Sequence, residues 1–384
     1  MSIILNYEHI EIMLNHYNKK NKDYILSNLH NYKRIEKFEC KECNLSFLPN
    51  FRLLSSFNLL INLDCSNNNL VELPDLYHLT SLEVLLCNNN NLIILPNILP
   101  SSLIYLDCSN NKLSRLPNLS NLTFLKKLIC NNNNLTELPA SLPNSLINLD
   151  CRKNNLMELP ISLPNSLIEL NCYKNNLIKL PQYLPKTLNY LFCSFNNLIE
   201  LPKYLPKTLD NLYCNDNQLI KLPNLINTNI RILYCGSNKL TEIPELPNTL
   251  TYFDCTNNNL TRLPKVNDCL LYSLYCKNNK LIEYPFLPLT LRSFMFDTDI
   301  LYKYSSIFPI NYINTLELPQ ENLYTYYEVI DVINLFNNII KRMKFIDINL
   351  LLEHSARICL NPKRIERLLN TKEIDFFDDT FSQI

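Results

Sequence analysis

Glycine is almost absent from this chain of 384 residues: it occurs once, at Gly236, and tryptophan does not occur at all. A single glycine excludes glycine-rich phosphate loops and dinucleotide-binding fingerprints, because both need several glycines close together. The 22 prolines are therefore expected to shape the turns by fixing φ. The 36 basic and 36 acidic residues balance, and no long basic run occurs, so we expect no nucleic-acid partner.

The chain also lacks the signals of a secreted or membrane protein. No run of 18 apolar residues occurs, so no membrane-spanning helix is expected. The first residues, MSIILNYEHIEIML, lack the basic start and clean apolar core of a signal peptide. We therefore interpret the 15 cysteines as reduced thiols of a cytoplasmic protein. The five histidines have no metal-binding spacing, and we expect no catalytic residue, metal or cofactor.

Cysteine and asparagine, in contrast, recur with a regular step. Eleven cysteines lie 20 to 22 residues apart, and an asparagine follows each one three residues later. The cysteines are Cys65, Cys87, Cys108, Cys130, Cys151, Cys172, Cys193, Cys214, Cys235, Cys255 and Cys276. The asparagines are Asn68, Asn90, Asn111, Asn133, Asn154, Asn175, Asn196, Asn217, Asn238, Asn258 and Asn279. A step this regular indicates one small structural unit copied many times.

The unit is clearest in LINLDCRKNNLMELP, residues 146–160. Leucines lie five and two residues before the cysteine and five and eight after it, and a proline closes the unit. This is the leucine-rich repeat pattern LxxLxLxxNxL, with cysteine in the third leucine position. An earlier copy contains Cys40, with Cys43 in the asparagine position, and a degenerate last copy has Phe296 in the cysteine position. The pattern predicts about 12 clear repeats and one degenerate repeat over residues 35–301.

Each repeat predicts its own local structure. Leu149 inward, Asp150 outward and Cys151 inward is the alternation of a short strand. Strands from successive repeats then form a parallel sheet on the concave face of a solenoid. The asparagine amide can satisfy buried backbone groups of its own turn and of the next. Many repeats carry a second proline, such as Pro164, so we expect a convex side of extended and 3₁₀ segments.

The two ends of the chain leave the repeat pattern. Residues 1–34 carry apolar residues at helical spacing, which predicts a helical N-terminal cap that covers the first repeat. Residues 302–384 predict a small helical C-terminal region, with a helix start at Asn361 and Pro362. The organisation is therefore a cap, a solenoid over residues 35–301 and a helical region.

The outward strand positions hold the candidate binding site, because no core constraint selects their residues. An aromatic patch is predicted on the C-terminal half of the concave face, bordered by Tyr173 and Phe195. Its members are Tyr190, Phe192, Tyr213, Tyr234, Tyr252 and Tyr275. Tyrosine-rich patches are typical anchors of protein interfaces. The alternative is that these rings only stabilise the sheet.

The four other cysteines also have structural interpretations. Cys40 and Cys43 form a CxxC, but no further zinc ligand is near, and both occupy repeat positions. Cys269 lies in a convex loop and Cys359 in the tail, where either could be reactive. Cys359 belongs to an apolar helical stripe, which favours burial.

These motifs resemble two known groups of proteins. The repeat pattern LPNSLxxLxCxxNxLxxLP and the tail segment NPKRIERLL resemble those of leucine-rich repeat proteins of giant amoeba viruses of the mimivirus group. The double-proline unit is also similar to secreted leucine-rich repeat effectors of bacteria, some of which carry a cysteine-dependent ubiquitin ligase domain. The viral resemblance implies action on host factors in the host cytoplasm.

Together these observations predict a non-enzymatic, monomeric scaffold that binds a protein on its concave face. The alternative is an adaptor or ligase of the ubiquitin system. In that alternative the repeats select the substrate, and the helical C-terminal region recruits the machinery or performs the transfer.

Overall fold

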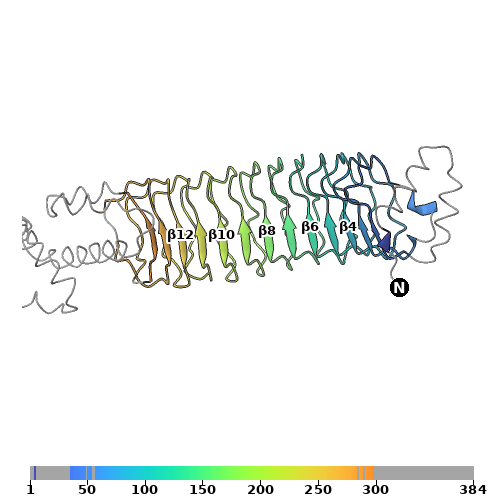
Figure 1. The fold of residues 1–384 in the computed structure, drawn as a ribbon. Coiled ribbons are helices and arrows are strands. Elements are labelled where there is room, and N and C mark those ends of the chain that lie inside the picture. The colour runs from blue at the N-terminus through green and yellow to red at the C-terminus, as the bar shows by residue number, and fades with distance from the viewer. Residues whose placement is uncertain are drawn as a thin grey trace, which may run out of the picture.

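The computed structural model describes the backbone of residues 4–5 and, with side chains, residues 35–48, 50–53, 57–282, 285–288 and 290–297. Over this range the chain is a solenoid with one short strand per turn (Figure 1). The helical N-terminal cap, apart from residues 4–5, and the C-terminal region at 302–384 lie outside the described residues and stay predictions. The predicted fold class, a leucine-rich repeat solenoid, is confirmed.

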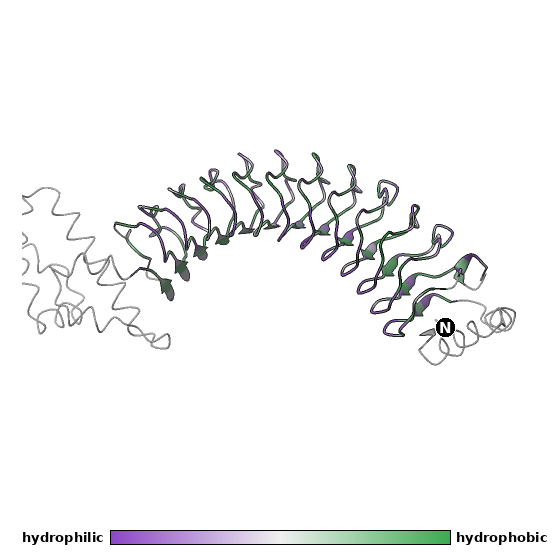
Figure 2. Ribbon diagram, turned by 90° about the horizontal axis from the view of Figure 1, so that it is seen from above, coloured by the Kyte–Doolittle hydropathy of each residue, from purple (hydrophilic) through white to green (hydrophobic). Residues whose placement is uncertain are grey.

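In the described part of the chain, fourteen strands form one sheet in chain order, and every neighbouring pair is parallel. They are β1 (Ile4–Leu5), β2 (Lys37–Glu39), β3 (Asn62–Asp64), β4 (Val84–Leu86), β5 (Tyr105–Asp107), β6 (Lys127–Ile129), β7 (Asn148–Asp150), β8 (Glu169–Asn171), β9 (Tyr190–Phe192), β10 (Asn211–Tyr213), β11 (Ile232–Tyr234), β12 (Tyr252–Asp254), β13 (Ser273–Tyr275) and β14 (Ser293–Met295). The sheet lines the inner side of an arc (Figure 2).

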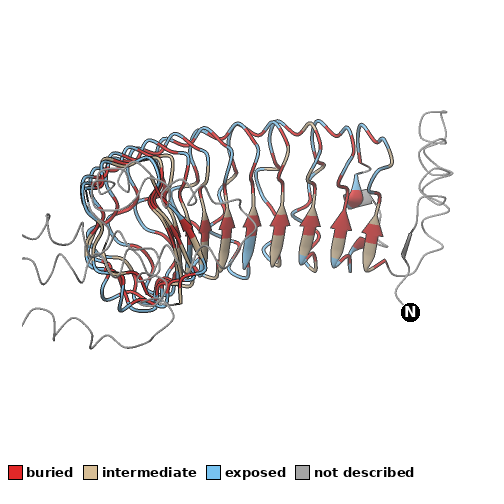
Figure 3. Cartoon of the chain, turned by 60° about the vertical axis from the view of Figure 1, so that its left-hand side comes forward, coloured by how far each residue is buried: buried red, intermediate tan, exposed pale blue. Residues whose placement is uncertain are grey.

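The predicted alternation of buried and outward residues is confirmed. In β7 the central Leu149 is buried, its two neighbours are half-buried, and Cys151 directly after the strand is fully buried. The strand therefore begins one residue earlier than predicted and ends before the cysteine. The same pattern repeats along the sheet, so the core is a continuous column of leucine and cysteine between the two sides of the coil (Figure 3).

Strand β1 was not predicted from the sequence. It lies within the segment predicted as a helical cap and adds to the edge of the sheet, with Ile4 opposite Lys37 and Leu5 opposite Phe38. A strand of two residues is too short to show a period, so the sequence carried no signal for it. Its pairing leaves the edge of β2 covered, which is how exposed sheet edges are commonly protected.

The convex side contains turns and extended segments, as predicted, with a 3₁₀ helix η1 at Phe51–Leu53. The second proline of many repeats begins a turn: the carbonyl of Pro164 accepts from the N–H of Leu167 at 3.1 Å, and Pro185 does the same with Leu188 at 3.0 Å. Hydroxyl groups link neighbouring turns here. The Thr187 hydroxyl donates to the carbonyl of Leu167 at 2.7 Å, one turn earlier.

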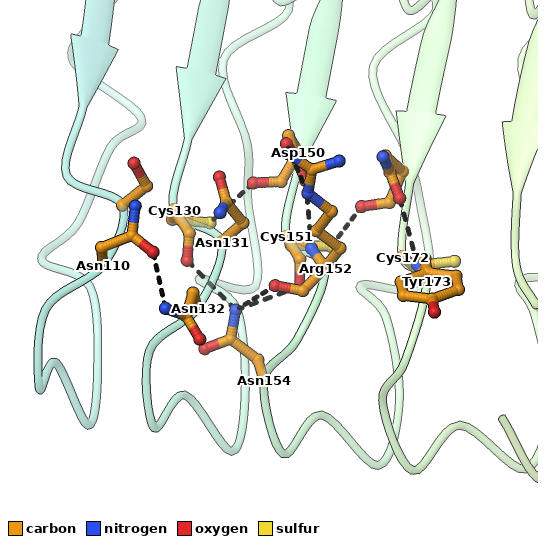
Figure 4. A network of polar contacts seen from close by, with 12 residues as sticks. Asn110, Cys130, Asn131, Asn132, Asp150, Cys151, Arg152, Asn154, Cys172 and Tyr173 are labelled. Atoms are coloured by element: carbon orange, nitrogen blue, oxygen red, sulfur yellow. Dashed lines mark hydrogen bonds and ion pairs between the residues drawn. The ribbon is translucent and has the colours of Figure 1, made fainter. Parts of the chain in front are cut away.

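The asparagine of each repeat forms the predicted internal ladder. The Asn154 amide nitrogen donates to the carbonyls of Cys151 at 3.0 Å and Cys130 at 3.1 Å (Figure 4). Its Oδ1 accepts from the N–H of Leu135 at 3.0 Å. One amide thus satisfies backbone groups of its own turn and of the preceding turn. The predicted direction, toward the next turn, was wrong, because the turn that follows each strand lies against the asparagine of the repeat after it.

All eleven predicted ladder asparagines make this set of bonds. Each accepts from the N–H of a leucine one turn earlier; the accepting residues are Asn68, Asn90, Asn111, Asn133, Asn154, Asn175, Asn196, Asn217, Asn238, Asn258 and Asn279. Ten of them are buried; Asn279 is half-buried. At the start of the ladder Cys43 replaces asparagine, and its N–H donates to Oδ1 of Asn68 at 3.0 Å.

The residue before each ladder asparagine has a left-handed backbone, with φ between 51° and 58°. These residues are Asn67, Asn89, Asn110, Asn132, Lys153, Lys174, Phe195, Asp216, Ser237, Asn257 and Asn278. Asparagine tolerates this conformation better than other residues with a side chain, and it occupies six of the eleven positions. The one glycine, Gly236, has no positive φ, so this chain builds its tight turns without glycine.

The core cysteines are free thiols that bond to the next strand. Cys151 donates twice to the carbonyl of Asn171, from N–H at 2.8 Å and from Sγ at 3.4 Å. Burial raises the pKa of every thiol in the column, from Cys40 to Cys276. The thiols therefore stay protonated and act as small apolar side chains.

Candidate functional site

The concave face is built from the two outward residues of each strand. Strand register places these residues in two columns that run along the solenoid: Tyr213 lies opposite Phe192 on one side and Tyr234 on the other. Because neighbouring strands of a sheet are about 4.8 Å apart, aromatic residues in the same column are close enough to stack. Packing in the core does not set the identity of these outward residues.

Five of the six predicted aromatic residues form one continuous row, which we call the aromatic row: Phe192, Tyr213, Tyr234, Tyr252 and Tyr275. Ring centroids lie 4.8 Å apart from Phe192 to Tyr213, 4.7 Å to Tyr234 and 4.6 Å to Tyr252, with interplanar angles of 14° to 25°. The last pair, Tyr252 and Tyr275, meets edge to face at 5.3 Å. The row changes column at Tyr252, because Asp254 holds the other outward position of β12.

Tyr190 stands apart from the row. It lies in the other column, opposite Glu169 and Asn211, and among the described residues no ring contact joins it to Phe192 or Tyr213. Tyr173 and Phe195 form a separate edge-to-face pair at 5.2 Å in the turns after their strands. The structure thus brings together five members of the predicted patch, with the border residues beside them.

The tyrosines of the row are half-buried hydrogen-bonding groups. Desolvation raises the pKa of Tyr213 and, more strongly, that of Tyr252, whose hydroxyl is also near the Tyr234 hydroxyl. Both phenols therefore stay protonated through the physiological range. The Tyr275 hydroxyl shares a hydrogen bond of 2.9 Å with Oγ of Ser293. The row offers hydroxyl groups and ring edges to a partner.

Five of the six acidic outward residues lie on the other half of the concave face, in β2 to β8. The outward positions of β2 to β14 carry six acidic residues and two basic ones, Lys37 and Lys127. The acidic residues are Glu39, Asp64, Asp107, Asp150, Glu169 and Asp254. Lys37 pairs with Glu39, and Lys127 lies over the ring of Tyr105 at 4.9 Å from its centroid. The strand face therefore carries a net excess of four negative charges within a chain of net charge zero.

Three of these aspartates have a local role that the sequence analysis missed. One carboxylate oxygen of Asp107 accepts from both the N–H and the hydroxyl of Ser109, at 3.0 and 2.7 Å. Asp64 with Ser66 and Asp254 with Thr256 repeat this arrangement. The signal was present as Asp-Cys-Ser or Asp-Cys-Thr, a local side-chain turn that ends the strand.

The remaining candidate groups give no further site in the described part of the chain. Cys40 is buried; Cys43 is half-buried, and its Sγ donates to the carbonyl of Lys41 at 3.2 Å. Cys269 is buried, with Sγ 3.6 Å from the carbonyl of Pro247, which argues against reactivity. Cys359 lies outside the described residues. Within them, no group of three His, Cys, Asp or Glu side chains is placed to hold a metal.

Comparisons with known proteins agree with this architecture. No family model matches the sequence, and a search of curated proteins finds no match. Among solved structures the chain is similar to YopM, a leucine-rich effector protein from Yersinia pestis. The identity is 30%, the match covers 68% of this chain and 77% of YopM, and the TM-score is 0.56.

Two further structures extend the likeness. The functional domain of InlJ from Listeria monocytogenes, which includes a cysteine ladder, is 31% identical over 68% of this chain and 53% of that domain, with a TM-score of 0.53. The leucine-rich repeat domain of APL1B matches at 20% identity over 79% of this chain and 90% of that domain, with a TM-score of 0.61, and this match shows the fold alone.

The chain belongs to the leucine-rich repeat proteins. The predicted similarity to bacterial effectors is confirmed at the level of this family. No finding supports the resemblance to proteins of giant amoeba viruses, which stays a prediction. In the described residues no helix is long and apolar enough to cross a lipid bilayer.

Proposed function

We propose that this protein is a binding scaffold that holds a protein partner against the C-terminal half of its concave face. The observation that carries the proposal is the aromatic row, which continues without a break over five neighbouring strands, β9 to β13. Solenoids of stacked repeats present extended concave surfaces of this kind. Tyrosine is among the residues that anchor protein interfaces most strongly.

The exposure of the rings supports binding in addition to sheet stabilisation. Stacking between neighbouring strands contributes to the sheet whether or not a partner binds. The five rings of the row are nevertheless only half-buried, so their edges and hydroxyl groups face the inner side of the arc. A contiguous and accessible aromatic surface of this kind favours a partner.

The test is a pull-down with the whole chain and two matched double variants. Tyr213→Ala with Tyr234→Ala interrupts the aromatic row. Tyr183→Ala with Tyr204→Ala removes two convex tyrosines that are 72% and 69% exposed. We expect preys that are retained by the wild type and the convex variant and lost from the concave variant. Identical preys for all three folded proteins would contradict the proposal.

The finer identity of the partner depends on the viral resemblance. We propose that the protein acts as a monomer in the cytoplasm, and that a host factor is the partner if the chain is viral. Quantitative recovery of preys from an amoeba lysate, compared with a bacterial lysate, tests this part. Preys that depend on the aromatic row and come only from the bacterial lysate would exclude it.

An adaptor or ligase of the ubiquitin system is the alternative proposal. It depends on residues 302–384, outside the described part of the chain, and none of the contacts on the concave face favours it over simple binding. A thioester-linked ubiquitin on Cys359 that is absent from Cys359→Ser would support a ligase. A tail that neither carries ubiquitin nor binds ubiquitin-system components would remove this alternative.

A further inference from the structure

The aromatic row borders directly on the acidic part of the same sheet face. Glu169 lies opposite Tyr190, and Asn171 lies between Asp150 on β7 and Phe192 on β9. We infer that the partner contributes an extended basic segment, whose cationic groups meet Asp150 and Glu169 while its apolar groups lie along the aromatic row. This inference rests on the proposed function and specifies the charge and the apolar groups of the partner's binding segment.

The geometry of the row limits which groups a partner can place there. From Phe192 to Tyr252 the rings are stacked nearly parallel, so each inner ring has both faces covered by neighbouring rings. A partner therefore meets ring edges and hydroxyl groups, against which aliphatic chains pack. Lysine and arginine side chains suit such a surface, because an apolar stem lies along it while the charged head reaches further.

In the described part of the chain, the two carboxylates beside the row share one basic partner: Arg152, in the turn after β7, pairs with Asp150, with Nε 3.4 Å from Oδ2. The pKa of Asp150 is raised, first by desolvation and further by Glu169 and Asp107, although Arg152 opposes the effect. Glu169 accepts a hydrogen bond from the Asn148 amide at 2.7 Å, which is a neutral partner. Negative charges that repel one another on a partly desolvated surface favour a partner that carries positive charge.

Elsewhere on the same face, one cation already lies against a tyrosine, here over the face of its ring. Lys127 lies over the Tyr105 ring, with Nζ 4.9 Å from the ring centroid. The hydroxyl of the same ring donates to Oδ2 of Asp107 at 3.4 Å. A tyrosine, a carboxylate and a cationic side chain thus occur together on three outward positions of β5 and β6. The ligand proposed here would bring cations to the same residue types between β7 and β13, against ring edges in place of a ring face.

The span of the surface sets the size of the binding segment. Six strand intervals separate β7 from β13, which at about 4.8 Å each correspond to about 29 Å. An extended chain rises about 3.3 Å per residue, so about nine residues cover the distance. A synthetic peptide of twelve residues is sufficient as a probe. It carries arginines in its first half and leucines in its second half, separated by serines.

The experiment measures binding of this arginine peptide to the whole protein by fluorescence anisotropy, with a glutamine-for-arginine peptide as the matched control. We expect the arginine peptide to bind at low ionic strength, more tightly than the glutamine peptide, and to weaken as salt is added. The variant Asp150→Asn with Glu169→Gln should weaken it about three- to tenfold, the range of two partly exposed ion pairs.

A second charge-matched variant separates a local from a general effect. Glu158→Gln with Glu200→Gln removes the same charge from exposed positions outside the strands, and we expect a change within about twofold, because distant surface charges are screened. The concave variant keeps its turn, since Asn171 accepts from the N–H of Tyr173 at 3.2 Å just as Asp150 accepts from that of Arg152.

The outcomes distinguish this inference from the proposed function. Equal binding of both peptides, lost together in Tyr213→Ala with Tyr234→Ala, would overturn the preference for cations and leave concave-face binding in place. Arginine binding that falls equally in both charge variants would reduce the effect to net charge and overturn the inference. No binding of the arginine peptide at low ionic strength would also overturn it, while the pull-down decides the proposed function independently.

Discussion

The two faces of the same sheet differ in how they vary along the molecule. On the side that faces the core, each turn repeats one arrangement: a leucine, a cysteine and an asparagine. The asparagine amide forms hydrogen bonds to two turns, as that of Asn154 does. On the concave face, the outward residues vary: β3 to β8 carry four acidic residues among polar, aliphatic and other side chains, and β9 to β13 carry the aromatic row. Uniform columns hold the coil together, whereas the place where a column changes marks the candidate site.

The difference follows from what each position must satisfy. An inward residue contacts the turns before and after it, so a change in one repeat disturbs three. An outward residue contacts its cross-strand neighbours and solvent, and many side chains meet that requirement. Variation on the concave face therefore carries information about function that the uniform interior does not.

The largest predicted effect tests the interior as a whole. Burial raises the pKa of the twelve column thiols, so above pH about 8.5 only the unfolded chain releases these protons. Stability is unaffected by the thiols below that pH and falls as pH rises above it, by about 1.4 kcal/mol per pH unit for each thiol. We expect unfolding between pH about 8.5 and 10, followed by circular dichroism.

A triple variant provides the control for this titration. Replacing Cys151, Cys172 and Cys193 by valine removes about a quarter of the titrating thiols while keeping apolar side chains in the column. The loss of stability per pH unit should be about a quarter smaller in this variant. A wild-type protein whose free energy of unfolding is constant from pH 8 to 10 would show that the thiols do not titrate on unfolding.

The second prediction compares neighbouring asparagines on opposite sides of the chain. The Asn175 side chain bonds to the carbonyls of Cys151 and Cys172 and to the N–H of Leu156, each at 3.1 Å. Asn175→Ala leaves those groups unpaired and should lower the free energy of unfolding by about 1–3 kcal/mol. Asn176 is exposed, and Asn176→Ala should change it by less than about 0.5 kcal/mol. Denaturant melts with equal midpoints for both variants would refute the ladder.

The third prediction separates the two roles of the aromatic row. The rings of Tyr213 and Tyr234 stack at 4.7 Å, so a double-mutant cycle to leucine should give a coupling energy of about 0.5–1.5 kcal/mol. Stability measured without a partner reports the stacking, and the pull-down reports the binding. A coupling energy of zero would mean that the rings do not stabilise the sheet, and the row would then be explained by binding alone.

The smallest predicted effect concerns the left-handed positions. Lys153 and Lys174 have φ of 53° and 54°, where six other repeats carry asparagine. Replacing either by asparagine should raise the free energy of unfolding by about 0.5–1 kcal/mol, because asparagine tolerates this conformation better. Lys179→Asn, at an exposed position without positive φ, is the control. Destabilisation by both turn variants would contradict the conformational argument.

Several features could be predicted from the sequence because they repeat. The period of Cys151 and its counterparts identified the solenoid, the inward column and the asparagine ladder, since each residue met the same environment in every turn. The aromatic row was predicted by the same register, in which Phe192, Tyr213 and Tyr234 occupy equivalent positions.

Other features could not be predicted, for physical reasons that differ. Each ladder asparagine bonds to the preceding turn because that turn packs against it. The spacing of residues in the sequence does not show which of the two neighbouring turns does so. Tyr190 was predicted to belong to the patch because it occupies an outward strand position. Stacking requires rings that face each other, however, and the ring that stacks on Tyr234 is that of Tyr252. The hydroxyl of Thr187 donates to the carbonyl of Leu167 across turns, a contact that the sequence analysis did not predict.

The spacing of leucine, cysteine and asparagine by itself determined that this chain is a coil of equivalent turns. Copies that must bury the same positions can all do so by adopting one conformation and stacking on one another. The tertiary structure alone decided which side chains of different turns meet. Contacts between turns depend on distances of a few ångströms across the sheet, and those distances exist only once the turns have stacked.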